Sequence, residues 1–262
     1  MSAPNANETT RAPLGRLYLV PTPLDFGCAT TAAIQEVMPL GSLQVAAGLT
    51  HWISENAKST RAFLKRVGEV CPLAQPMQAM VITELPREVH KKGDHRSDFD
   101  ARPLLQAALQ GHDMGLISEA GMPAIADPGA SVVRAAHALG LAVVPLTGPI
   151  SLMLALAASG LNGQNFAFVG YLPQDASARQ KRLRELESLA LRSGQTQMFI
   201  ETPYRNAALW EAMLQNLQPT TRVMRASGLT LPSMQVQSLS VKEARQSPAL
   251  AHDLPTVFGI GA

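Results

Sequence analysis

The chain has 262 residues, of which 46% are hydrophobic and 16% charged, and its formal net charge is +2. This balance is typical of a globular protein with a large buried core and excludes a disordered chain. The small net charge does not by itself indicate a nucleic-acid partner. Residues 148–262 nevertheless hold ten basic and seven acidic side chains, a mild excess that permits contact with phosphate.

Alternating strands and helices are predicted in the first half of the chain. Short isolated apolar runs predict strands at 16–20, 43–47, 80–83, 114–117 and 142–146. The segments between them predict helices at 30–37, 55–67, 100–110 and 128–139, and the last two are followed by glycine. This alternation predicts a mostly parallel sheet with right-handed crossovers.

A Thr-Gly-Pro sequence at 147–149 marks the expected boundary between an N-terminal α/β domain at 14–147 and a C-terminal α/β domain at 148–262. In the second half, strands are predicted at 166–170, 198–201, 222–226, 234–239 and 256–260. Helices are predicted at 151–158, 177–190 and 207–217, with a helical turn from Val241. Two successive strands near the end indicate a mixed sheet.

The small number of cysteines bears on the cellular compartment that we expect for the protein. Cys28 and Cys71 are its only cysteines, so neither a disulfide framework nor a metal site is expected, and a reducing, cytoplasmic compartment fits best. Residues 1–13 have no apolar run and are expected to be a polar tail. The uncharged stretch at 138–174 is broken by glycine and proline, so no membrane helix is expected there.

The segment Gly115–Gly129, GLISEAGMPAIADPG, is the most informative part of the chain. A strand leads into a loop of small residues, and open α/β sheets bind ligands outside the carboxyl ends of their strands. The loop carries two acids, Glu119 and Asp127. Because Asp127 precedes Pro128, it is expected to cap the following helix, a role that is compatible with ligand contact.

The motifs of several common enzyme classes are missing from the sequence. No dinucleotide fingerprint, phosphate-binding Walker loop, zinc-protease helix or hydrolase nucleophile elbow is found. Basic residues cluster three times, and such clusters are more often solvated faces than RNA contacts. The clusters are Lys58, Arg61, Lys65 and Arg66; Lys91, Lys92, His95 and Arg96; and Arg179, Lys181, Arg182 and Arg184.

Taken in order, these segments resemble the tetrapyrrole methylase superfamily, the class III S-adenosylmethionine-dependent methyltransferases, and within it the ribosomal RNA small subunit methyltransferase I branch. The resemblance extends from Leu17 to Ile260. The family motifs TP, SDAGTP with SDPG, VVPLPGPSA, ASGL, GFLP and ESPHR match residues 22–23, 118–123 with 126–129, 143–151, 158–161, 170–173 and 201–205.

The resemblance implies two α/β domains, S-adenosylmethionine bound in a cleft between them, and a homodimer. In this branch the methyl acceptor is a cytidine ribose 2′-hydroxyl, which makes RNA the expected partner. The implied cofactor-binding residues are Pro23, Glu119, Ala120, Gly121, Pro123, Ala126, Asp127, Gly148 and Pro149.

Departures from the branch pattern concentrate outside the cofactor segments. The branch motif E-D-T-R reads E-N-A-K at 55–58, and its late E-L-T-K reads G-L-T-L at 228–231. Glu55 keeps the acid of the first motif and is the candidate general base. Arg61 and Arg205 are candidates for holding substrate phosphate. Two alternatives stay open: a small-molecule or tetrapyrrole methyltransferase, and a cofactor-binding protein without catalysis.

Overall fold

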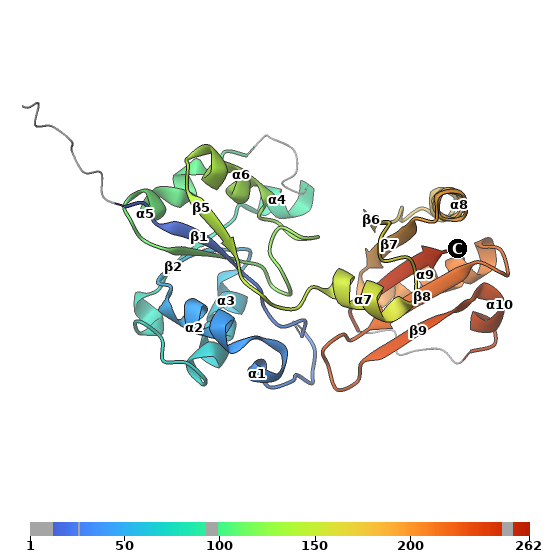
Figure 1. Cartoon of the computed structure of the whole chain (residues 1–262), viewed down its shortest axis with the longest axis horizontal. Coiled ribbons are helices and arrows are strands. Elements are labelled where there is room, and N and C mark those ends of the chain that lie inside the picture. Colours follow the sequence, from blue (N-terminus) through green and yellow to red (C-terminus); the bar gives the residue numbers. More distant parts are fainter. Residues whose placement is uncertain (1–12, 26, 93–98, 248–253) are drawn as a thin grey trace, which may run out of the picture. The chain divides into compact units, whose positions relative to one another are not determined.

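The computed structural model describes residues 13–25, 27–92, 99–247 and 254–262, with the side chains of 90–92 excepted. The chain forms two compact units (Figure 1): Met1–Thr22 with Met38–Gly148, and Pro23–Val37 with Pro149–Ala262. The second unit thus includes a segment that the expected domain ranges, 14–147 and 148–262, assign to the first. The predicted polar tail, except Pro13, lies outside what is described, as do His95, Arg96 and the side chains of Lys91 and Lys92 in the basic cluster at 91–96.

The strands of the first unit are parallel, as the alternating pattern predicted, and the five of them form one sheet in the order β3-β2-β4-β1-β5. Their bounds are β1 Arg16–Val20, β2 His51–Ser54, β3 Val81–Glu84, β4 Met114–Ile117 and β5 Ala142–Pro145. Gly115 of β4 pairs with Trp52 of β2, and a Cβ at Gly115 would lie 2.5 Å from the Trp52 ring. The glycine therefore makes room for the buried indole.

Helices cover both faces of this sheet (Figure 1), with α2 Leu40–Gly48 and α3 Ala57–Gly68 on one side and α5 Gln106–Leu109 and α6 Ala130–Ala138 on the other. Helix α3 buries Thr60, Phe63, Leu64 and Val67, the spacing of one helical face. The fully buried Leu17, Ile53 and Leu116 pack with Val132 and Ala136 of α6. The shorter elements are η1 Met77–Ala79, α4 Arg87–Lys92 and η2 Arg102–Leu105.

The predicted strand at 43–47 is wrong, because these residues lie inside helix α2, and the true strand β2 follows it at His51–Ser54. A short apolar run fits a buried helix as well as a buried strand, and tertiary packing decided between them. The predicted helix at 100–110 is a 3-10 turn, η2, followed by the single-turn α5.

The second unit contains a mixed sheet, as predicted, in the order β6-β7-β10-β8-β9. Strands β6 and β7 are parallel, and the other three pairings are antiparallel. The strand bounds are β6 Phe166–Tyr171, β7 Thr196–Glu201, β8 Arg222–Ser227, β9 Gln235–Ser240 and β10 Thr256–Gly261. The helices are α1 Ile34–Val37, α7 Ser151–Ser159, α8 Ala176–Ser193, η3 Pro203–Arg205, α9 Asn206–Asn216 and α10 Val241–Ala244.

Two apolar clusters flank the second sheet. Phe199 and Phe258 pack with Trp210 of α9 and with residues of α8 and α10. Met198 and Met224 belong to the other cluster, with residues of α7 and with Leu24 from the early segment Pro23–Val37. Among the described residues, no helix is long and apolar enough to cross a bilayer.

Candidate functional site

The carboxyl ends of the central strands of the first unit meet at one edge of its sheet. The last residues of β1 and β2, Val20 and Ser54, both pair with Ile117, the last residue of β4. Because parallel strands end together, the residues that follow them are brought to the same place. The backbone N–H of Glu55 donates to the carbonyl of Ile117 at 3.1 Å, which fixes Glu55 directly beside the start of the loop after β4.

The loop after β4, residues 118–129 and called the 118–129 loop below, is held in an unusual backbone shape. Gly121 exchanges two backbone hydrogen bonds with Thr22, of 2.9 and 3.1 Å. Ala124 and Ala126 have φ of +65° and +64°, and Gly129 has φ of +136°. Positive φ strains an L-residue and is concentrated at functional sites, so the loop conformation is specified by its surroundings.

The predicted capping role of Asp127 is wrong. Helix α6 begins at Ala130, and its N-cap residue is Gly129 and not Asp127. The carbonyl of Pro128 accepts a hydrogen bond from the Ala124 N–H at 3.2 Å, so Pro128 belongs to the loop and not to the first helical turn. The Asp127 carboxyl therefore does not cap α6 and can take part in other contacts.

Three predicted residues, Glu55, Glu119 and Asp127, form an acidic cluster at this edge of the sheet. One carboxylate oxygen of Glu55 accepts the backbone N–H of Glu119 at 3.1 Å. Burial, and then the negative charges of Glu55 and Glu119, raise the pKa of Asp127 to about 7. The structure therefore combines anionic groups with a carboxyl that changes its protonation near neutral pH.

Two residues that the sequence reasoning did not single out organise this cluster. The Asn56 side chain caps α3 by accepting the Lys58 N–H at 2.9 Å, and its amide donates to Glu119 at 2.8 Å. Glu84, the last residue of β3, accepts the Ala57 N–H at 2.7 Å. Each is an acid or amide at the carboxyl end of a parallel strand, where ligands bind, and this position is the signal that could have identified both residues.

A cavity of about 290 Å³ adjoins the cluster, and its size is near the lower end of the range for ligand pockets. It is lined by Glu55, Asn56, Glu84, Leu85, Arg87 and Glu119. Its wall thus carries three carboxylates and one guanidinium, which favour cationic or hydroxyl-rich ligands. In the described part of the chain, no group of three His, Cys, Asp or Glu residues is arranged to hold a metal ion.

The remaining predicted cofactor residues lie on several segments. Ala120, Gly121, Pro123 and Ala126 belong to the 118–129 loop. Gly148 ends the first unit, where a Cβ would lie 2.3 Å from a side-chain carbon of Pro21, so only glycine fits there. Pro23 and Pro149 begin the two segments of the second unit.

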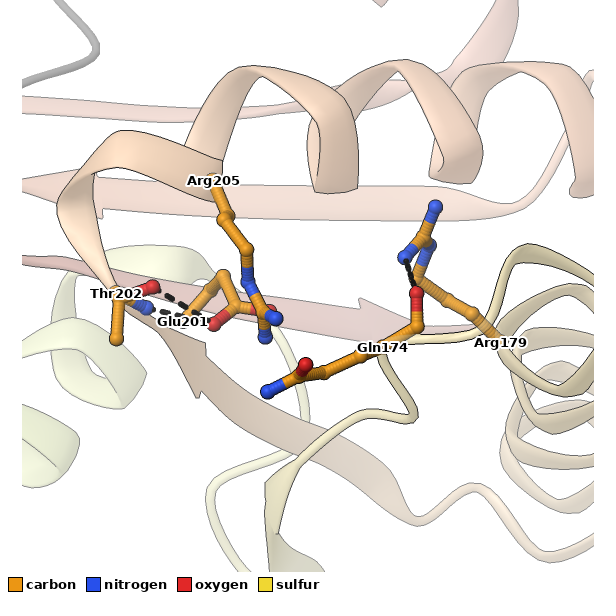
Figure 2. Close-up of polar contacts among 5 residues, drawn as sticks. All are labelled: Gln174, Arg179, Glu201, Thr202 and Arg205. Carbon is orange, nitrogen blue, oxygen red and sulfur yellow. Dashed lines mark hydrogen bonds and ion pairs between the residues drawn. The ribbon is translucent and has the colours of Figure 1, made fainter.

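The two predicted phosphate-binding arginines also lie in different units. Arg61 is exposed on α3, and Arg205 ends η3 in the second unit. The Arg205 guanidinium pairs with the buried Glu201 carboxylate at 2.5 Å, and Thr202 donates to Glu201 from its backbone N–H at 2.7 Å (Figure 2). First this hydrogen bond with Glu201, and then the nearby charges, raise the pKa of Arg205.

Curated relatives match parts of the chain. Ribosomal RNA small subunit methyltransferase I of Vibrio cholerae serotype O1 is 35% identical over 150 residues, which cover 57% of this chain and 51% of that protein. The protein of the same name from Escherichia coli O157:H7 is 29% identical over 216 residues, covering 82% and 66%. The matches therefore span about half to two thirds of the length of these relatives.

Solved structures and a family model complete the comparison. The methyltransferase CobJ is 18% identical and has a TM-score of 0.54, with 94% of each chain covered. Native uroporphyrin III C-methyl transferase from Thermus thermophilus is 16% identical with a TM-score of 0.53, covering 94% of this chain and 97% of that one. These likenesses show the fold. The model of tetrapyrrole (corrin/porphyrin) methylases matches residues 53–245, and the chain belongs to this family.

Proposed function

We propose that this protein is an S-adenosylmethionine-dependent methyltransferase whose acceptor is a ribose 2′-hydroxyl of ribosomal RNA. The observation that carries the proposal is the meeting of the acidic cluster with the 118–129 loop at the carboxyl edge of a parallel sheet, in a chain of the tetrapyrrole methylase family. The names of the curated relatives support ribosomal RNA as the substrate.

The residues present fit the cofactor. The 118–129 loop is rich in glycine, alanine and proline, whose small side chains let a ligand approach the backbone closely. The carboxylate of Glu119 suits both a sulfonium cation and ribose hydroxyls. When bound, S-adenosylmethionine supplies a methyl group that is already activated for transfer. Pro23, Ala120, Pro123, Ala126, Gly148 and Pro149 are proposed to complete its site.

The protein's own part is then to orient the acceptor hydroxyl and to take its proton. Glu55 is our candidate for the proton acceptor, because it lies on the cavity wall and is fixed there by Glu119 and Ile117. Asp127, with its pKa raised to about 7, is half protonated at neutral pH and can hold a proton within the same cluster. Arg61 and Arg205 are proposed to hold substrate phosphates.

A basic surface in the second unit supports RNA over a small acceptor. An open groove of about 610 Å³ follows one face of α8 and is lined by Lys181, Arg184 and Arg192 together with Glu185 and polar residues. Cationic side chains spaced along one helix match a phosphate backbone better than a single small molecule. We further propose a cytoplasmic homodimer; light scattering of the purified protein tests the dimer.

Two measurements on the purified protein test the function. Calorimetry with S-adenosylmethionine and its demethylated thioether tests cofactor binding, and transfer of tritium from labelled cofactor to ribosomal RNA, with mapping of the product, tests the reaction. Transfer to a tetrapyrrole instead would replace the RNA proposal. Cofactor binding without any transfer would indicate a binding protein, and absence of binding would refute the assignment.

The variant Glu55→Gln tests the proton acceptor. Glutamine keeps an oxygen that can accept the Glu119 N–H, so the loop is retained while the base is lost. We expect turnover to fall about 100-fold or more, with unchanged affinity for the thioether product. Glu69→Gln, an exposed acid at the end of α3, is the matched control. Equal turnover in both variants would remove Glu55 from the mechanism.

A further inference from the structure

Two of the three tyrosines of the chain lie exposed around one arginine of the second unit. Tyr204 is 81% exposed and Tyr171 is 58% exposed, whereas Tyr18 is buried. Both exposed phenols lie close enough to Arg205 to add to the effect of Glu201 in raising its pKa. Aromatic residues make up only 5% of this chain, and two exposed aromatic side chains near one another indicate a binding surface.

Arg205 is held in place by its own unit. Its guanidinium pairs with Glu201, whose side chain is only 2% exposed and which also accepts the backbone N–H and the hydroxyl of Thr202 (Figure 2). In the same view the side-chain amide of the exposed Gln174 extends toward Glu201 and Arg205, and the backbone carbonyl of Gln174 accepts a 2.9 Å hydrogen bond from the Arg179 guanidinium. The surroundings therefore combine a fixed cation with an amide.

A β-bulge precedes Tyr171, the last residue of β6. Along β6 the register with β7 shifts between Phe168, which pairs with Met198, and Tyr171, which pairs with Ile200. Gly170 within the bulge has φ of +75°, a conformation that favours glycine. Bulges of this kind redirect the side chains that follow them, often next to binding sites. Tyr171 consequently lies next to the strand end that carries Glu201.

We infer that Tyr171, Tyr204, Arg205 and Gln174 form a platform for single-stranded RNA, an inference that rests on the proposed function. Exposed tyrosine rings stack on bases of any sequence, while a guanidinium binds the phosphate between them and an amide bonds base edges. A duplex keeps its bases stacked on one another and offers no free base to the two rings. The platform thus selects unpaired nucleotides and positions the acceptor strand.

Fluorescence anisotropy with a labelled 12-nucleotide single-stranded RNA, free of self-complementarity, tests the platform. Tyr204→Ala and Tyr171→Ala should each weaken binding about 5- to 150-fold, because stacking on one aromatic ring contributes about 1–3 kcal/mol per base. Tyr204→Phe keeps the ring and should bind within about twofold of the unchanged protein. Arg205→Gln should lower the slope of log Kd against log salt by about one.

Phe166→Ala is the matched control, because Phe166 is a partly exposed aromatic residue at the opposite end of β6. It should leave the affinity unchanged, and a 16-base-pair RNA duplex should bind without dependence on either tyrosine. Loss of affinity in Phe166→Ala equal to that in Tyr204→Ala would overturn the platform, as would wild-type affinity in both tyrosine-to-alanine variants.

Activity separates failure of the platform from failure of the proposed function. If the unchanged protein methylates ribosomal RNA and Tyr204→Ala has the same KM for that RNA, the platform is refuted and the methyltransferase proposal stands. If the tyrosines govern binding of the single strand but no RNA is methylated, the proposed function fails while the platform is supported.

Discussion

Replacing Asp127 with asparagine should stabilise the first unit at pH 8 and have little effect at pH 4. Asp127 lies half-buried in the 118–129 loop, and burial together with the charges of Glu55 and Glu119 raises its pKa to about 7. At pH 8 the native state therefore holds an unfavourable carboxylate. Asparagine has the same shape and cannot ionise.

The sign and size of the effect follow from linkage. The reference pKa of Asp127 is 3.8 and its folded pKa is about 7, so folding retains a proton that the unfolded chain has released. The stability associated with this proton is complete below about pH 4 and is lost as the pH rises toward 8. A difference of about 3 pKa units corresponds to about 4 kcal/mol as an upper limit. Solvent contact at the half-buried side chain reduces this to about 2 kcal/mol.

Urea unfolding at pH 4 and pH 8 measures this difference. The chain has two tryptophans, and a Trp210→Phe background leaves the buried Trp52 as the fluorescent reporter of the first unit. We expect Asp127→Asn to raise the unfolding midpoint at pH 8 only.

Asp113→Asn is the control of opposite sign, because a hydrogen bond from Arg16 lowers the pKa of Asp113. It should lower stability at pH 8. If Asp127→Asn were equally or less stable than the parent at pH 8, the acidic cluster would not carry the repulsion inferred here.

Two further predictions concern the packing around the site. Gly115→Ala should destabilise the first unit by about 1–3 kcal/mol in urea unfolding, because the new Cβ would lie 2.5 Å from the Trp52 ring; an unchanged midpoint would contradict this close packing. Asn56→Ala should cost about 0.5–2 kcal/mol, since it removes the cap of α3, and should also weaken cofactor binding through Glu119, which calorimetry would detect; wild-type values in both would exclude this role.

Much of the fold was predictable because its signals are local. Strands β1 and β4 have the predicted bounds, since each is an isolated apolar run followed by a turn. The strand expected at 43–47 failed for the opposite reason: its leucine and alanine residues suit a helix, and the true strand β2 has only four residues. The packing of Trp52 against Gly115, which favours β2 as the strand, joins segments far apart in the chain.

For the candidate site, the sequence pointed to residues that the structure brings together, but not to the contacts between them. The loop motif identified Glu119 and Asp127, and the structure brings both to Glu55. The cap expected at Asp127 was wrong because Ala124 and Ala126 adopt positive φ and delay the start of α6, which no local propensity reveals. Asn56 was missed because its contact with Glu119 joins segments far apart in the chain.

The early segment Pro23–Val37 has a consequence for how the protein is made. Leu24 packs with residues that come after position 149, so the second unit cannot be completed until the ribosome has released the C-terminal part of the chain. The first unit has all of its residues once position 148 has emerged. A gene fragment that begins at Pro149 would lack Leu24 and leave its apolar neighbours uncovered, so the second unit is not separable by a single cut.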